Sequence, residues 1–366
     1  MTFFIDCRKE SSVNEASPLW HSELNLPMNP YNYQSPKLPS FLHDQFISVA
    51  DNTPDENQVS DWGATLGRVL FYDKRLSKNK LISCGSCHIQ QYGFSDTARF
   101  SRGFDNGKTK RHSMSLVNSR YYVSGNFFWD ERAKSLESQV LEPIKDHVEM
   151  GMTLDSVIVR LKKTAYYAQL FQYAFGSQKI DTVTISKALS QFVRSIVSYQ
   201  SKFDVGRERV SRTSDNFPNF TQSENRGKAI FFKKNDLSCS SCHMTAAFFG
   251  DMARNNGLSL TSDRGVGGIS NNNMDMFTFK SPSLKNIAIR PPYMHDGRFS
   301  SLSEVIDHYS SGISEHNYID PHFKTATGIF QFNLTPLEKQ DLINFLNTLT
   351  DEKLLTDQKF SDPNYP

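Results

Sequence analysis

Two stretches of the sequence place two thiols and an imidazole at a spacing that could do chemistry. They are Cys84-Gly85-Ser86-Cys87-His88 and Cys239-Ser240-Ser241-Cys242-His243. Both read Cys-x-x-Cys-His, the attachment signal for a c-type haem. The two thiols add to the two vinyl groups of one porphyrin, and the histidine that follows can bind the iron as its proximal ligand. Zinc knuckles or a redox-active Cys-x-x-Cys are the alternatives. Because a chain with 5 Cys and 10 His would rarely contain two such pentapeptides by chance, we predict two covalently bound haem c groups.

The composition excludes several classes of protein. The 366 residues are enough for two domains with complete hydrophobic cores. The net charge of +2 gives no reason to expect a nucleic acid as partner. The mean hydropathy is −0.51, and no apolar run approaches the roughly 18 residues that a membrane span needs. The two motifs use all the cysteines except Cys7, so a disulfide framework is not expected.

The first residues resemble the end of an export signal. Residues 3–5 are apolar but too few for the hydrophobic core of a complete signal peptide. Cys7 follows them closely, as it would at the end of a lipoprotein signal whose start is missing; the alternative is an incidental cysteine in a disordered terminus. Because haem c is attached outside the cytoplasmic membrane, we expect a periplasmic protein, or an outer-membrane lipoprotein anchored at Cys7 that faces an extracytoplasmic space.

The patterns outside the motifs predict a mainly α fold with irregular loops. Residues 8–60 are polar and rich in Pro, Asn and Ser, which is typical of an irregular arm. An apolar helical stripe over residues 66–71 precedes the first haem motif. The capping-box sequence at 221–224 begins a helix before the second motif. This repeated plan is typical of two cytochrome c-like haem domains.

Later signals set the boundaries of these domains. Amphipathic spacing over 185–196 predicts a long helix that closes the first domain. The capped sequence at 335–338 predicts the start of the last helix. We therefore predict an N-terminal arm over residues 1–60 and a first haem domain over residues 61–200. A charged linker over residues 201–220 then leads to a second haem domain over residues 221–366.

From about residue 61 to residue 351, the sequence resembles the bacterial dihaem cytochrome c peroxidases and their relative MauG. Besides the haem motifs, the resemblance rests on Phe128-Trp129-Asp130-Glu131-Arg132-Ala133, Val148-Glu149-Met150-Gly151 and Pro292-Tyr293-Met294-His295-Asp296-Gly297-Arg298. The resemblance implies a haem peroxidase that acts on hydrogen peroxide. It also implies a peroxidatic haem in the first domain, an electron-transfer haem in the second, and a protein that donates electrons.

The resemblance implies roles for four residues near the first haem. Trp129 matches the tryptophan that relays electrons between the haems; its easily oxidised indole suits this role, and a core aromatic is the alternative. Glu149 matches the acid and base that takes a proton from peroxide and returns it to the leaving oxygen. An apolar haem pocket would raise the pKa of this carboxyl group, whereas a solvated helix residue is the alternative. Gln139 and Pro143 match residues that line the distal pocket.

The loop after the first motif bears on the first haem and on a metal ion. Many family peroxidases close the first haem with a distal histidine from this loop, but residues 89–111 contain no histidine. We therefore expect a five-coordinate first haem. His112 stands where the family has an asparagine that holds calcium together with backbone carbonyls near Arg290 and Pro292. Because calcium prefers oxygen ligands, this histidine leaves the binding of calcium in doubt.

The second haem has His243 as its expected proximal ligand and Tyr309 at the position of the distal ligand. By resemblance, conventional peroxidases have a methionine at that position and MauG has a tyrosine. Tyr309 also falls on one apolar helical face with residues 302–306, so a plain core tyrosine is the alternative. A thioether ligand raises the haem potential, whereas a phenolate favours ferric and higher states. A His/Tyr haem is thus a poor acceptor for a soluble electron donor.

Together these residues favour a MauG-type peroxidase, which oxidises a Trp or Tyr side chain of a partner protein. The first alternative is a conventional peroxidase that reduces hydrogen peroxide with electrons from a small cytochrome c. A second alternative is a pure electron carrier, against which Glu149 and the open first haem argue. MauG also uses a surface tryptophan shortly before its second haem motif, but Leu237 occupies the corresponding region here, so that route is not implied.

The two motifs generate a first prediction. Replacing Cys84 or Cys87 by alanine should remove the first haem and leave the second, because each haem has its own pair of thiols. Intact-mass measurement should find two haems on the wild-type protein and one on either variant. A single haem on the wild-type protein would contradict the assignment of both motifs.

Overall fold

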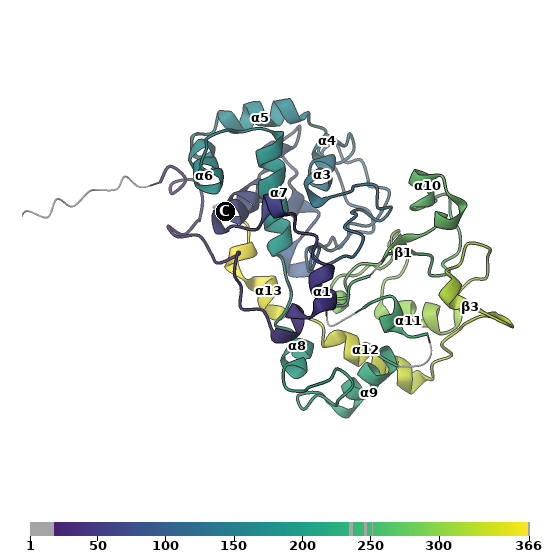
Figure 1. Ribbon diagram of the computed structural model, residues 1–366. Coiled ribbons are helices and arrows are strands. Elements are labelled where there is room, and N and C mark those ends of the chain that lie inside the picture. Colours follow the sequence, from purple (N-terminus) through teal and green to yellow (C-terminus); the bar gives the residue numbers. More distant parts are fainter. Residues whose placement is uncertain (1–17, 234–236, 245–246, 251, 365–366) are drawn as a thin grey trace, which may run out of the picture.

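Two helical lobes make up the computed structural model of this chain, which describes residues 18–233, 237–244, 247–250 and 252–364 (Figure 1). The first lobe contains α1 (Gln45–Val49), α2 (Asp61–Tyr72), α3 (Leu136–Gln139), α4 (Glu142–Lys145), α5 (Leu154–Lys162), α6 (Ala165–Phe175) and α7 (Thr182–Ser195). The second contains α8 (Lys202–Arg207), α9 (Gln222–Phe231), α10 (Gly267–Ser270), α11 (Leu302–Ser311) and α12 (Pro336–Asn347), and α13 (Glu352–Thr356) follows. The prediction of a mainly α fold is confirmed.

Strands contribute little to the described part of the chain. β1 (Ala253–Arg254) pairs antiparallel with β2 (Phe279–Lys280), and β3 (Lys324–Thr325) pairs antiparallel with β4 (Gly328–Ile329). In the first pair Ala253 lies opposite Lys280. These short ladders fix loops of the second lobe and form no separate layer.

A pair of helices forms the core of the first lobe. The side chain of Ser60 accepts a hydrogen bond from the amide of Gly63 and so begins α2. Asp181 begins α7 with a capping box. The two helices lie in close contact, because Gly67 of α2 meets the backbone carbonyl of Ala188 and leaves no room for a Cβ atom. The end of α2 then leads to the 3-10 turn Cys84–Ser86 of the first haem motif.

The second lobe repeats this arrangement. Thr221 caps α9 with a capping box, and Thr335 caps α12 in the same way, as the sequence predicts. Gly227 of α9 meets the backbone carbonyl of Asp341 in α12, again with no room for a Cβ atom. The repeated plan predicted from the sequence is therefore present as a pair of glycine-mediated helix contacts, one in each lobe.

The described part of the N-terminal arm, residues 18–60, is mostly irregular apart from α1 and short 3-10 turns, and it packs closely on the first lobe. Trp20 and Leu24 are each only 1% exposed and belong to the core of that lobe. Leu24 also forms a bridge with Asn364 near the other end of the chain. Cys7 lies outside the described residues, so its lipidation stays a prediction.

Two segments pack across the predicted boundaries. Phe203, in the predicted linker, is buried in the core of the second lobe. Leu354 and Phe360, near the end of the chain, belong instead to the core of the first lobe, and Figure 1 shows the yellow C-terminal segment returning there. The side-chain amide of Gln90 donates to the carbonyls of Leu354 and Asp357, both at 2.9 Å. The domain boundaries themselves stay a prediction.

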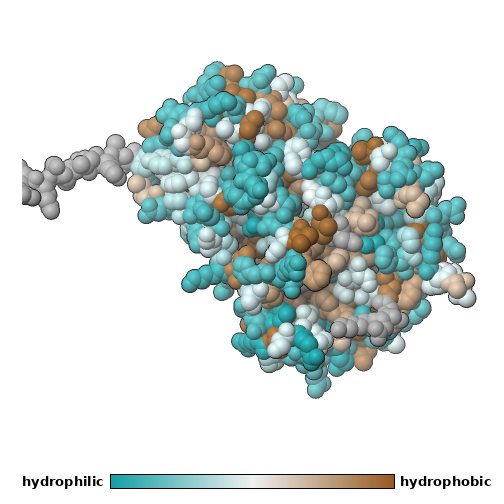
Figure 2. Space-filling view, in the orientation of Figure 1, coloured by the Kyte–Doolittle hydropathy of each residue, from teal (hydrophilic) through white to brown (hydrophobic). Residues whose placement is uncertain are grey.

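The surface is mainly polar. On the face drawn in Figure 2, apolar residues form small groups between larger hydrophilic areas. Within the described ranges, every helix is too short or too polar to span a lipid bilayer.

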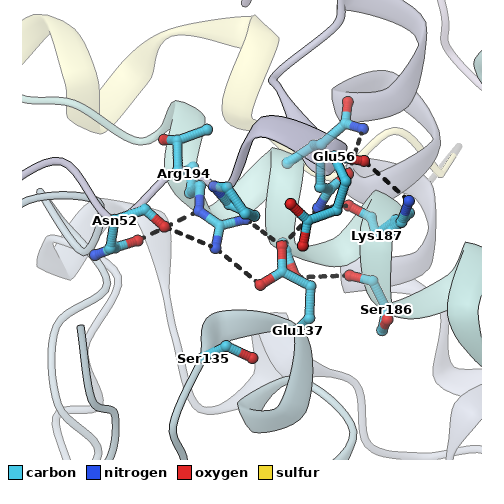
Figure 3. A network of polar contacts seen from close by, with 12 residues as sticks. Asn52, Glu56, Ser135, Glu137, Ser186, Lys187 and Arg194 are labelled. Carbon is cyan, nitrogen blue, oxygen red and sulfur yellow. Dashed lines mark hydrogen bonds and ion pairs between the residues drawn. The ribbon is translucent and has the colours of Figure 1, made fainter.

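A buried arginine joins three elements of the first lobe (Figure 3). Arg194 of α7 is 1% exposed at its side chain, and its two terminal nitrogens both donate to the carboxylate of Glu137 in α3, one of them at 2.9 Å. The same guanidinium bonds Asn52 of the arm at 3.3 Å. Asn57 donates to Glu137 at 2.6 Å. Because the pair is bidentate and shielded from water, it holds α3 against α7.

This network generates a second prediction. Replacing Glu137 by alanine should lower the free energy of unfolding by about 3 kcal/mol, because it leaves the buried Arg194 charge without its partner. Urea denaturation of the haem-loaded protein would measure the change.

Glu142 provides the matched control. Its carboxylate pairs with Lys145 at 2.7 Å, but both side chains are 45% exposed. Replacing Glu142 by alanine should therefore cost less than about 1 kcal/mol. Equal losses in the two variants would contradict a special role for the buried pair.

Candidate haem sites and the residues between them

A large cavity lies beside the first haem motif. It has a volume of about 1050 Å³, and its lining includes five residues singled out from the sequence: His88, Trp129, Gln139, Pro143 and Glu149. These residues come from the first haem motif, the loop before α3, α3 itself, α4 and the loop after α4. The structure thus brings the predicted pocket residues together around His88.

The first motif has the geometry of a haem attachment turn. The amide of His88 donates to the carbonyl of Cys84 at 2.9 Å, and Cys84 and Cys87 line a small adjoining cavity with His88. Nδ1 of His88 lies 3.1 Å from the carbonyl oxygen of Phe94. This contact orients the ring and leaves Nε2 to bind iron. The thiols, the imidazole and the cavity therefore fit a haem.

The thiols of both motifs are poor candidates for redox catalysis. Burial raises the pKa of Cys84 to about 12, that of Cys87 to about 11 and that of Cys239 to about 12. A redox-active Cys-x-x-Cys needs a thiolate, which a lowered pKa provides. The raised pKa values of these three half-buried thiols disfavour that alternative and agree with thioether attachment.

A second cavity surrounds the second motif. It has a volume of about 200 Å³, and its lining includes Cys239, Cys242, His243 and Tyr309. Tyr309 lies on α11, and its hydroxyl oxygen accepts a hydrogen bond of 3.1 Å from the side-chain amide of Asn256. Burial raises the pKa of Tyr309 to about 12, against the effect of the Asn256 hydrogen bond. The phenol therefore faces the space in which a haem on His243 would lie.

Met294 also lies at this cavity, and the sequence reasoning missed it. Its sulfur is 3.5 Å from the same Asn256 amide nitrogen that contacts Tyr309. The backbone of Met294 has a φ of 73°, in the left-handed region that few residues other than glycine adopt. The motif at 292–298 contains this methionine, but nothing in its spacing indicates that a turn directs the side chain toward the Tyr309 hydroxyl.

Trp129 lines both cavities. Its indole Nε1 donates to the carbonyl of His112 at 2.8 Å, and its own carbonyl accepts from the amide of Lys280 at 2.8 Å. The ring also makes an edge contact with His295, with centroids 6.4 Å apart. The indole is thus held between the two haem sites by groups from both lobes.

Glu149 has the environment expected of a proton-transfer group. Burial raises its pKa to about 7, the nearby Asp146 charge adds to this, and Arg132 opposes it. The amide of Glu149 donates to the Asp146 carboxylate at 3.1 Å, and its carbonyl accepts from the amide of Phe104 at 2.9 Å. Because the backbone is fixed on both sides, the side chain is directed toward the cavity it lines. A carboxyl group with this pKa exchanges protons at neutral pH.

His112 does not offer a calcium site. Its two ring nitrogens lie 3.2 Å from the hydroxyl of Ser95 and 3.1 Å from the carbonyl of Ala98. Burial and the charge of nearby Arg290 lower the pKa of His112. Arg290 is itself buried, and a buried guanidinium would repel a divalent cation at this place. The residues around His112 therefore fit calcium poorly.

A family model described as di-haem cytochrome c peroxidase matches residues 62–209. Curated relatives extend the similarity over most of the chain. The methylamine utilization protein MauG of Methylorubrum extorquens is 34% identical over 305 residues, which are 82% of this chain and 81% of that protein. The cytochrome c551 peroxidase of Nitrosomonas europaea is 30% identical over 249 residues, which are 67% of this chain and 71% of that protein.

Solved structures share the same fold. One is a MauG-like protein associated with microbial copper homeostasis. It is 32% identical, has a TM-score of 0.75, and the match covers 91% of this chain and 99% of that one. The diheme peroxidase BthA of Burkholderia thailandensis has a TM-score of 0.69 at 20% identity, over 85% of this chain and 92% of that one.

The surroundings of His112 generate a third prediction. Treatment of the haem-loaded protein with EGTA should leave the absorption spectra of both haems and the melting temperature unchanged, because the His112 ring offers no oxygen ligand and the nearby Arg290 charge disfavours a cation. The control is the same treatment followed by added calcium, which should also have no effect. A loss of activity that calcium restores would contradict this reading of the site.

Proposed function

The chain belongs to the di-haem cytochrome c peroxidase and MauG family, and from that premise we propose that it is a MauG-type peroxidase. It would use hydrogen peroxide at the His88 haem to oxidise a Trp or Tyr side chain of a partner protein. The observation that carries the finer assignment is the Tyr309 hydroxyl, which faces the second haem cavity. The enzyme would act in the periplasm, where haem c proteins mature.

Two haems on the Cys-x-x-Cys-His motifs would supply the iron chemistry that reduces peroxide and holds the oxidising equivalents. The residues of the chain would transfer protons and limit the access of peroxide to the first cavity. Glu149, with a pKa of about 7, would take a proton from the peroxide bound in the first cavity and return it to the leaving oxygen. Gln139 and Pro143 line the same cavity and would limit the space around the bound peroxide.

Trp129 would carry electrons between the two sites. Its indole lies in the lining of both cavities, and it is held at Nε1 by the carbonyl of His112. A rigid ring keeps one distance to each site, and the rate of electron transfer depends steeply on distance. The relay would let an equivalent produced at His88 reach His243 without a diffusing carrier.

Tyr309 would make the second haem a poor acceptor for a soluble cytochrome. The Asn256 amide donates to the Tyr309 oxygen, and this hydrogen bond favours the phenolate. Burial opposes ionisation, but a bound ferric iron would offset that cost, because a metal ion lowers the pKa of its ligands. A phenolate ligand stabilises ferric iron, so the remaining source of electrons is an oxidisable side chain of another protein.

A conventional cytochrome c peroxidase is the second candidate, and Met294 favours it. The Met294 sulfur shares the Asn256 amide with the Tyr309 oxygen, so a thioether lies close to the expected ligand position. A thioether ligand would raise the potential of the second haem and suit electron uptake from a small cytochrome c. The relative from Nitrosomonas europaea is named as such a peroxidase.

The choice between these candidates is the fourth prediction. Replacing Tyr309 by methionine should raise the reduction potential of the second haem and increase peroxidase activity with reduced cytochrome c. Redox titration and steady-state assays would measure both effects. The wild-type enzyme should turn over cytochrome c slowly, with a kcat below ~1 s⁻¹, at the lower end of ordinary enzymes.

Met294→Leu is the matched control, because it removes the neighbouring sulfur and keeps an apolar side chain of similar size. It should leave the potential and the resting EPR spectrum of the second haem unchanged. A large change in the Met294 variant, or a wild-type kcat with cytochrome c well above ~1 s⁻¹, would favour the conventional peroxidase instead.

A further inference from the structure

A buried tyrosine, glutamate and lysine form a cluster beside the Trp129 relay. Tyr122, Glu131 and Lys280 are 2%, 9% and 7% exposed. The Tyr122 hydroxyl donates a hydrogen bond to Oε1 of Glu131. Tyr122 lines the first cavity together with His88 and Trp129, and Lys280 lines both haem cavities. The cluster therefore adjoins both haem sites.

The backbone at Glu131 is strained. Its φ of 54° lies in the left-handed region, which is unfavourable for a residue with a Cβ atom. A glycine would satisfy this turn without that cost, so what Glu131 adds is its carboxylate. Apart from Tyr122, this carboxylate accepts from the side chains of Asn126 at 3.2 Å and Ser124 at 3.5 Å. Strain of this kind is a reason to look for a function of the side chain.

A carboxylate that accepts a hydrogen bond from a phenol makes the phenol easier to oxidise. A tyrosine that loses an electron must also lose its proton, because the phenol radical cation is a very strong acid. The buried hydroxyls of Tyr72 and Tyr33 donate to the backbone carbonyls of Phe360 and Lys359, which are too weakly basic to take that proton. Oε1 of Glu131 is a base already in contact with the Tyr122 hydroxyl.

Within the described ranges, one other buried tyrosine donates to a carboxylate, and it is poorly placed. The Tyr167 hydroxyl donates to the Asp73 carboxylate, but Arg75 binds both oxygens of that carboxylate at 2.9 and 3.0 Å. A carboxylate that is neutralised by arginine is a weak proton acceptor. Tyr167 belongs to the core of the first lobe and is not among the residues lining the haem cavities.

Lys280 connects Tyr122 with the relay. Its backbone amide donates to the carbonyl of Trp129 at 2.8 Å, and its Nζ lies 3.8 Å from the ring centroid of Tyr122. Nζ also donates to the carbonyl of Asn126 at 2.7 Å. A single residue therefore contacts Trp129 through its backbone and Tyr122 through its side chain, which fixes the two rings relative to each other.

We propose that Tyr122 is a redox-active residue that stores one oxidising equivalent beside the relay. One electron leaves Tyr122 through Trp129 for the site that hydrogen peroxide has oxidised, and the phenolic O–H bond breaks as its proton moves to Oε1 of Glu131. The products are a neutral tyrosyl radical and a neutral carboxylic acid. When the partner protein supplies an electron, the radical takes back that electron and the Glu131 proton. The inference rests on the proposed function, since peroxide must supply the oxidising equivalents.

Rapid freeze-quench EPR on the haem-loaded enzyme mixed with hydrogen peroxide tests this inference. The wild-type enzyme should give a tyrosyl radical signal that narrows when the protein contains ring-deuterated tyrosine. The signal should disappear in Tyr122→Phe. It should persist in Tyr121→Phe, the matched control, because Tyr121 is the neighbouring residue, is also buried at 4% exposure and lies beneath Arg120.

The Glu131→Gln variant tests the role of the base while it keeps the Tyr122 side chain. The amide keeps the size of the side chain but cannot take the proton, so the radical should form on the order of a hundredfold more slowly, the usual loss on removing a general base. Haem content, measured optically, would show whether each variant is loaded.

A wild-type enzyme without a tyrosyl signal, or a Tyr122→Phe enzyme that retains it, would overturn the proposal. If Tyr122→Phe fails to bind haem, the deuterated wild-type enzyme and Glu131→Gln decide the question. An optical response of both haems to peroxide without any tyrosyl signal would leave the peroxidase function standing and reject only this step. No optical response at all would reject both.

Discussion

The hydrogen bond from the indole of Trp129 to the carbonyl of His112 holds the residue on which both haem sites depend. The indole lines the two cavities, so any shift would change its distance to both. His112 is in turn tied to the other lobe, because its amide donates to the carbonyl of His295 at 2.8 Å. Trp129 is therefore positioned by hydrogen bonds across the interface of the lobes, so the relay proposed for it would depend on how the lobes are docked.

Charged groups reinforce the same interface. Arg111 binds Asp263 of the second lobe through two nitrogens, at 2.7 and 2.8 Å, and also pairs with Asp130 beside Trp129 at 2.5 Å. Such forked, charge-assisted bonds fix orientation as well as distance. Each lobe has its own helix pair and haem motif, but the groups that position the relay come from both. The position of Trp129 therefore depends on contacts from both lobes.

The sequence predicted what depends on local pattern. The haem turns, the capping boxes at Thr221 and Thr335 and the helical content follow from residues that are neighbours along the chain. The packing of Phe360 against the first lobe could not be predicted. No local pattern distinguishes this segment from the preceding helix of the second lobe, so the sequence provides no sign that the chain returns. The approach of Met294 to Tyr309, and that of Glu131 to Tyr122, depend on left-handed turns at residues other than glycine, which sequence patterns do not favour.

Proton partners distinguish the three residues to which the proposals above give roles in proton or electron transfer. At the first cavity Glu149 has a pKa of about 7 and can both take and return a proton. At the second, Tyr309 accepts a hydrogen bond from Asn256, which holds no exchangeable charge. Tyr122, which also lines the first cavity, donates to the Glu131 carboxylate. An electron that moves alone through a buried region leaves an uncompensated charge, which is costly. Under the proposed function, a base at the first cavity and another beside Trp129 would let electrons move between the lobes without charging the interior.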